Sequence, residues 1–96
     1  MKVVNKTTWD TKSLKRIFSK CLSQIKKDEK DNWKFKSFRV YVKWHRNGFH
    51  WVGGHAPYNW NWLTMLMPKM GHPSATERKV ADTFIHEVGH CLGVKH

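Results

Sequence analysis

The segment 86–96 concentrates the side chains of this 96-residue chain that could do chemistry. It reads His-Glu-Val-Gly-His-Cys-Leu-Gly-Val-Lys-His, which gives the pattern H-E-x-x-H-x-x-G-x-x-H. Its three imidazoles belong to His86, His90 and His96. Three protein ligands with a fourth position left for water are the donor set of a catalytic zinc site. We therefore expect these three histidines to bind Zn²⁺.

The spacing indicates how each residue would act. His86 and His90 are four residues apart, so a helix places both on one face. Glu87 can then act as the general base that takes a proton from the zinc-bound water. A straight helix cannot bring His96 to the same metal, but Gly93 tolerates the left-handed backbone of a sharp helix end, which would return His96 as the third ligand. The competing interpretation is a helix with surface histidines and a glycine cap.

The segment resembles the zinc signature of the metzincin metallopeptidases, with all five motif positions filled. The resemblance is strongest over 74–96 and extends more loosely upstream to about Phe38. It implies a zinc-dependent metallopeptidase, an endopeptidase acting on a peptide or protein substrate, with Glu87 as its catalytic residue. Metzincins continue past the third histidine into a subdomain with a methionine turn. The chain therefore resembles a minimal form without that subdomain, because Met65, Met67 and Met70 all precede the motif.

Length and composition favour a single domain spanning 1–96, a minimal zincin-like metallopeptidase domain by the resemblance. Two cysteines, Cys21 and Cys91, do not make a disulfide framework, although one bridge between them stays open. The N-terminus has no apolar core of a signal peptide, and no run is long enough to span a membrane. These features predict a reduced, cytoplasmic protein. The oligomeric state is not indicated.

The net charge of +11 is concentrated in the first half of the chain. Residues 1–48 hold 14 Lys and Arg against four acidic residues, whereas residues 49–96 hold four against three. A charge of +10 on one half favours an anionic partner, which could be nucleic acid, an anionic membrane surface or an acidic protein. It could equally be a solvated face that keeps the protein soluble.

Two other functions therefore compete with the peptidase. One is a basic nucleic-acid-binding module in which zinc is structural, with aromatic side chains such as Trp33 and Phe35 exposed for stacking. The other is a catalytically weak scaffold that holds a structural zinc. Glu87 favours catalysis, because a purely structural site needs no such carboxylate.

The first half predicts a helix and a strand. Asp10 is a suitable N-cap for a helix over about 11–27 with one apolar stripe and a basic opposite face. Alternation over 38–45 predicts a half-buried strand. Asn47-Gly48 favours a hairpin, with Phe49 and Trp51 on a short return strand. The glycines, proline and asparagines of 53–61 indicate a loop.

The second half predicts a strand and the helix of the motif. Trp62–Met67 is apolar and ends at Pro68; by the resemblance it is the edge strand at the rim of the cleft, along which a peptide would lie. Ser74 and Glu77 match a capping box, which would open a helix running to about Leu92. The expected fold class is α+β: a small mixed or antiparallel sheet packed on two helices, the C-terminal one carrying the zinc motif.

Three further residues near the motif have alternative roles. Asp82 lies one turn before His86 and is expected to be exposed, or else to orient a ligand imidazole. Cys91 adjoins His90 but points about 100° away on a helix, which favours a buried thiol over a ligand. His55 is the histidine outside the motif that lies nearest to the expected cleft rim.

Overall fold

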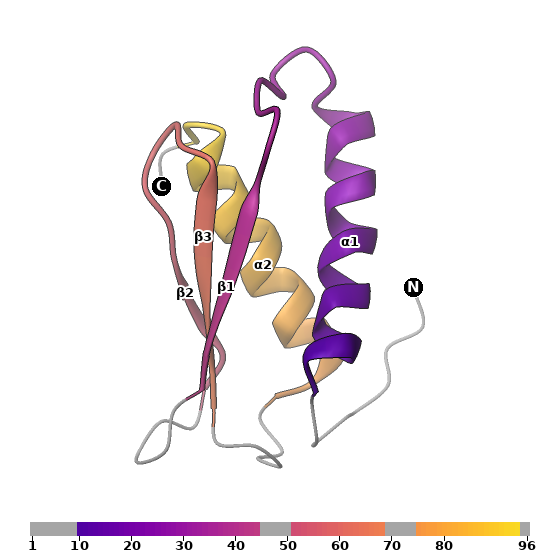
Figure 1. The fold of residues 1–96 in the computed structure, drawn as a ribbon, viewed down its shortest axis with the longest axis vertical. Helices are drawn as coiled ribbons and strands as arrows, with labels where there is room; N and C mark the ends of the chain where they lie inside the picture. The colour runs from indigo at the N-terminus through magenta and orange to yellow at the C-terminus, as the bar shows by residue number, and fades with distance from the viewer. Residues whose placement is uncertain (1–9, 45–50, 69–74, 95–96) are drawn as a thin grey trace.

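The computed structural model describes residues 10–44, 51–68 and 75–94. Their elements follow the order α1 (Thr11–Asp28), β1 (Arg39–Trp44), β2 (Gly53–His55), β3 (Trp62–Met67) and α2 (Glu77–Cys91). The expected α+β class is confirmed, with two helices and a mixed three-stranded sheet. Figure 1 shows the helices beside one another and the strands gathered next to α2.

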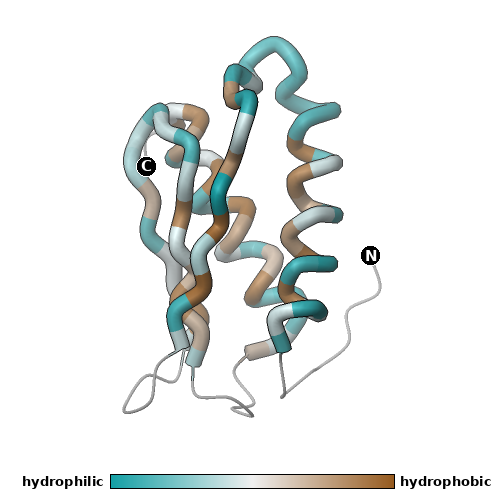
Figure 2. Tube along the Cα trace, in the orientation of Figure 1, coloured by the Kyte–Doolittle hydropathy of each residue, from teal (hydrophilic) through white to brown (hydrophobic). Residues whose placement is uncertain are grey.

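Helix α1 begins where the sequence predicts. The Asp10 side chain caps it by accepting a hydrogen bond from the Ser13 backbone N–H at 2.6 Å. The first part of the apolar stripe, Leu14, Ile17, Phe18 and Cys21, is buried, and the lysines are exposed. Figure 2 shows hydrophobic and hydrophilic residues alternating along this helix. Phe18 from this stripe stacks on Phe84 of α2, with ring centroids 4.6 Å apart. The two helices are therefore joined by an aromatic contact inside the core.

The sheet has the order β1-β3-β2, which corrects two predictions about the strands. β3 is the central strand, parallel to β1 and antiparallel to β2, so the expectation that Trp62–Met67 is the edge strand is wrong. The predicted return strand at 49–51 is also wrong at Trp51, which lies in a bend. The next strand is β2, and it pairs with β3 instead of returning along β1. The predicted hairpin turn, Asn47-Gly48, lies outside the described residues.

The short strand β2 replaces part of the predicted loop. Gly53 pairs with Leu66 and Gly54 with Met65 in the antiparallel register. Glycine usually weakens a strand, and it often marks a place where another group approaches the backbone closely. Both glycines here have such a neighbour, Trp51 at Gly53 and Glu87 at Gly54. The loop interpretation of 53–55 is wrong, because these residues pair with β3.

Both helices lie against the same face of the sheet. Val40, Leu63 and Met65 have side chains on this face by register, and Leu63 and Met65 are fully buried. α2 packs on β3 and β2, while α1 packs on α2 (Figure 1). The described elements therefore leave the opposite face of the sheet without a helix.

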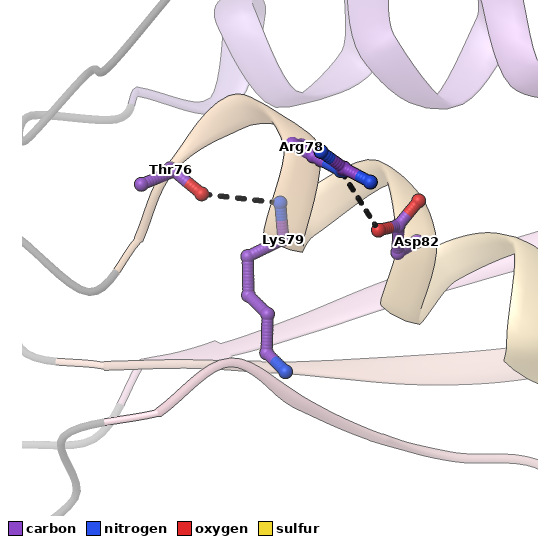
Figure 3. A network of polar contacts seen from close by, with 4 residues as sticks. All are labelled: Thr76, Arg78, Lys79 and Asp82. Carbon is purple, nitrogen blue, oxygen red and sulfur yellow. Dashed lines mark hydrogen bonds and ion pairs between the residues drawn. The ribbon is translucent and has the colours of Figure 1, made fainter. Parts of the chain in front are cut away.

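The N-terminus of α2 differs from the predicted capping box. Thr76 is the N-cap, and its hydroxyl oxygen accepts a hydrogen bond from the Lys79 backbone N–H at 3.2 Å (Figure 3). Glu77 is consequently the first helical residue and not the third, while Ser74 lies outside the described residues. Threonine caps a helix by the same chemistry as serine, and the helix begins two residues later than predicted.

Candidate metal centre

The buried apolar stripe of α2 determines how the helix is rotated against the core, and so where its motif residues lie. Val80, Phe84, Val88 and Cys91 are all fully buried, as their helical spacing predicts. With that stripe held in the core, His86 is exposed and His90 is half-buried on the flank of the helix.

The two described histidines of the motif converge. The Nε2 atoms of His86 and His90 are 3.1 Å apart, and their ring centroids are 4.8 Å apart. Two nitrogen ligands at about 2.0–2.1 Å from a tetrahedral zinc ion are separated by about 3.3 Å. At this distance the two imidazoles share a hydrogen bond, and the separation is also close to the one that a shared metal ion requires.

Glu87 is the one charged side chain buried among the described residues, with 6% of its surface exposed. Within that part of the chain, its carboxylate has no hydrogen-bond or ion-pair partner. A buried carboxylate without such partners is costly, so its presence calls for a functional explanation.

Gly54 of β2 provides the space that this carboxylate occupies. A Cβ placed on Gly54 would lie 2.7 Å from Oε2 and 2.9 Å from Cδ of Glu87, which is closer than atoms can approach. No residue with a side chain fits at position 54 while Glu87 keeps its place. The strand β2 therefore passes directly over the candidate general base.

The turn after α2 forms at Gly93 as predicted. Gly93 has φ +88°, its N–H donates to the His90 carbonyl at 2.9 Å, and the Val94 N–H donates to the Gly89 carbonyl at 2.9 Å. These two bonds and the left-handed glycine make a Schellman motif, which ends the helix and redirects the chain. His96, the predicted third ligand, lies outside the described residues.

The turn between β2 and β3 contributes two residues that the sequence did not single out. The ring of Tyr58 packs edge to face on His90, with centroids 5.2 Å apart. Asn59 has φ +55° and donates its backbone N–H to the His90 carbonyl at 3.2 Å. Its side-chain oxygen accepts a hydrogen bond from Lys34 Nζ at 3.2 Å. The sequence indicates only that Asn59 belongs to a loop. Asparagine tolerates a left-handed backbone, so its residue type was the one available signal for a sharp turn at this position.

Cys91 is a buried thiol, as predicted. Its Sγ donates to the Trp62 carbonyl at 3.2 Å, which joins α2 to β3. Burial, with a smaller contribution from the charge of Glu87, raises the pKa of the Cys91 thiol to about 11. Cys91 and Cys21 are both free thiols, so the bridge that the sequence left open is not formed.

Two other candidate residues, Asp82 and His55, contact neighbours outside the motif. Asp82 is exposed, as expected, and forms an ion pair with Arg78 at 3.7 Å (Figure 3). His55 lies on β2, where its ring contacts Trp62 at 5.7 Å between centroids.

The described residues bring together two of the three predicted ligands, and no group of three His, Cys, Asp or Glu that could hold a metal is found among them. In the same part of the chain, neither helix is long and apolar enough to cross a membrane. No family model, no curated protein and no solved structure matches this chain.

Proposed function

We propose that this protein is a zinc-dependent metallopeptidase in which His86, His90 and His96 hold the metal and Glu87 is the general base. One observation carries the proposal: Glu87 is a buried carboxylate without a partner among the described residues, and it directly follows His86, whose Nε2 atom is 3.1 Å from that of His90. A purely structural site would need the imidazoles but not the carboxylate. The alternative of a scaffold with structural zinc leaves Glu87 unexplained.

The chemistry follows from the roles of these side chains. Zinc, when bound, polarises the carbonyl of the scissile peptide bond and makes a water molecule more acidic. Glu87 takes the proton of the attacking water and passes it to the leaving amine. The Schellman turn at Gly93 redirects the backbone, which supports His96 as the third ligand. Asn59 fixes this turn from outside the helix through its bond to the His90 carbonyl.

The substrate would lie along β2, the strand that passes over Glu87. One edge of β2 pairs with β3, and no described element pairs with the other edge of β2. An extended peptide can add to such an edge by backbone hydrogen bonds, which positions it without specifying its side chains. β2 thus has, in this proposal, the peptide-binding role that the resemblance implies for Trp62–Met67.

The first test is the metal content of the full chain, purified without a histidine tag and measured by elemental mass spectrometry. We expect one zinc per chain, retained in Glu87→Gln. That variant should lose hydrolysis of a fluorescence-quenched peptide mixture, because only the base is removed. Glu77→Gln, the same substitution at the start of α2, is the matched control and should keep both properties.

Two outcomes would contradict the proposal in different ways. A protein that binds no zinc after zinc is supplied and the excess removed has no metal site. A protein that binds zinc but cleaves peptides no faster than Glu87→Gln has a structural site only.

A further inference from the structure

The face of the sheet that is turned away from the helices carries aromatic and cationic side chains. On β1 these are Arg39, Tyr41 and Lys43, and Tyr41 is 49% exposed. On the central strand they are joined by Trp62, which is half-buried. The register places Arg39 beside Trp62. We call this surface, which also includes His55 of β2 and Trp51, the outer sheet face.

Trp62 is the centre of an aromatic row that crosses all three strands. Its ring contacts Tyr41 of β1 at 6.3 Å and 74°, and His55 of β2 at 5.7 Å and 62°, both edge to face. Edge-to-face packing leaves parts of the ring faces accessible for further stacking. These aromatic side chains therefore support one another without closing the surface.

Trp51 extends the aromatic surface, because Gly53 has no side chain and the indole can lie over the glycine backbone. A Cβ placed on Gly53 would lie 3.3 Å from Nε1 of Trp51 and 3.7 Å from the Leu66 Cβ. The indole of Trp51 thus lies over the backbone of β2, and 54% of the residue is exposed. It lies on the outer face because the neighbouring Gly54 faces Glu87 on the inner one.

The charges of the outer sheet face are of one sign. Arg39 and Lys43 are exposed on β1 with Tyr41 between them, and none of the described side chains on this face is acidic. Exposed aromatic rings combined with cations are how proteins hold unpaired bases and their phosphates. We propose that the outer sheet face binds single-stranded nucleic acid, with bases stacking on Tyr41, Trp62 and Trp51 and phosphates contacting Arg39 and Lys43.

This location differs from the one expected from the sequence. Trp33 and Phe35 were predicted to be exposed for stacking, but both are half-buried. Their rings pack on each other and on Phe38, and Trp33 Nε1 donates to the Phe35 carbonyl at 3.1 Å. That cluster closes the end of the core. The outer sheet face is independent of the proposed metal centre, since Glu87 lies on the other side of the sheet.

The test is fluorescence anisotropy with labelled single strands of about 12 nucleotides, oligo-dT and oligo-rU, on the full chain at low salt. We expect both strands to bind more tightly than a duplex of equal length, because a duplex hides the faces of its bases. Tyr41→Ala should weaken binding about tenfold, which corresponds to about 1.4 kcal/mol. Tyr41→Phe keeps the ring and should bind like the wild type.

Matched controls lie off this face. Trp60 is 60% exposed but borders the 34–37 loop, so Trp60→Ala should leave binding unchanged. Arg39→Gln with Lys43→Gln should reduce the slope of log K against log salt by about 1.4, since each single-strand phosphate contact contributes about 0.7. Lys79→Gln on α2 should leave that slope unchanged.

Three results would overturn the proposal. The first is equal binding by Tyr41→Ala and Trp60→Ala in proteins that circular dichroism shows to be folded. The second is binding of the duplex as tight as that of the single strands. The third is displacement of the oligonucleotide by polyglutamate at an equal concentration of charge, which would identify an acidic protein as the partner.

Discussion

Gly54→Ala is the substitution that tests the candidate active site most directly, because it acts on the proposed base, Glu87, and leaves the proposed ligands unchanged. The new Cβ would lie 2.7 Å from Oε2 of Glu87, whereas ordinary contact begins at 3.4 Å. To reach ordinary contact, the carboxylate must therefore move by about 0.7 Å, the difference between these two distances. Since a misplacement of about 1 Å can reduce a rate about 10²-fold, we expect hydrolysis to fall about 10- to 100-fold.

Zinc binding should survive this change. The three atoms nearest to a Cβ at position 54 all belong to Glu87, so the direct clash is with this residue and not with the histidines. Overpacking at a well-filled position costs about 1–3 kcal/mol, which urea unfolding of the zinc-loaded protein will measure. The assay is cleavage of the peptide mixture together with zinc content per chain, compared with wild type and Glu87→Gln.

Gly53→Ala is the matched control, because it makes the same change one residue earlier and on the opposite face. Its Cβ would meet Trp51 at 3.3 Å, a tight contact far from the base, so hydrolysis should stay close to the wild-type rate. Wild-type hydrolysis in a folded Gly54→Ala protein would refute the argument. So would an equal loss in the two variants, because the effect would then come from the strand and not from Glu87.

Three further predictions concern the helix end, the metal and the core. Gly93→Ala should lower the free energy of unfolding by about 1–2 kcal/mol in urea titrations, since a left-handed alanine is strained and its Cβ would lie 2.6 Å from Oδ1 of Asn59. His96→Ala should reduce zinc affinity in competition with a chromogenic chelator, and stripping zinc from the wild type should lower its Tm, because a ligand at 100 times its Kd stabilises the folded state by about 2.7 kcal/mol. Burial raises the pKa of Cys21 above its ordinary value of 9.0, so the unfolded chain loses this proton first as pH rises. The contribution of the Cys21 thiol to the free energy of unfolding is therefore complete below pH 9.0 and is lost above it. The urea midpoint should accordingly fall less steeply between about pH 8 and pH 10 in Cys21→Ala than in the wild type.

The features that the sequence predicted well are those that depend on residues close together in the chain. Helix α2 follows from the 3.6-residue spacing of Val80, Phe84 and Val88, and the same spacing puts His86 and His90 on one flank. The turn at Gly93 requires only that a residue without a Cβ follows the last helical turn. Asp10 caps α1 for a similarly local reason.

The errors arose where pairing between distant residues decides the structure. Gly53 and Gly54 look like a loop by composition, and only their pairing with Leu66 and Met65 of β3 makes them a strand. That strand then covers the second edge of β3, a partner that the alternation within Trp62–Met67 does not reveal. The capping box failed for a different reason: Ser74 and Thr76 are both competent caps, and spacing alone did not separate them.

The two glycines of β2 also explain how the two proposed sites can be tested apart. Consecutive residues of a strand point to opposite faces, so Gly54 opens space for Glu87 on the inner face while Gly53 opens space for Trp51 on the outer one. A side chain added at one position does not reach the other site. Substitutions at Gly54 should therefore change hydrolysis without changing oligonucleotide affinity, and Tyr41→Ala should do the reverse. If either substitution changed both properties in a folded protein, the two faces would share one ligand, and a substrate extending around the edge of β2 would replace two separate sites.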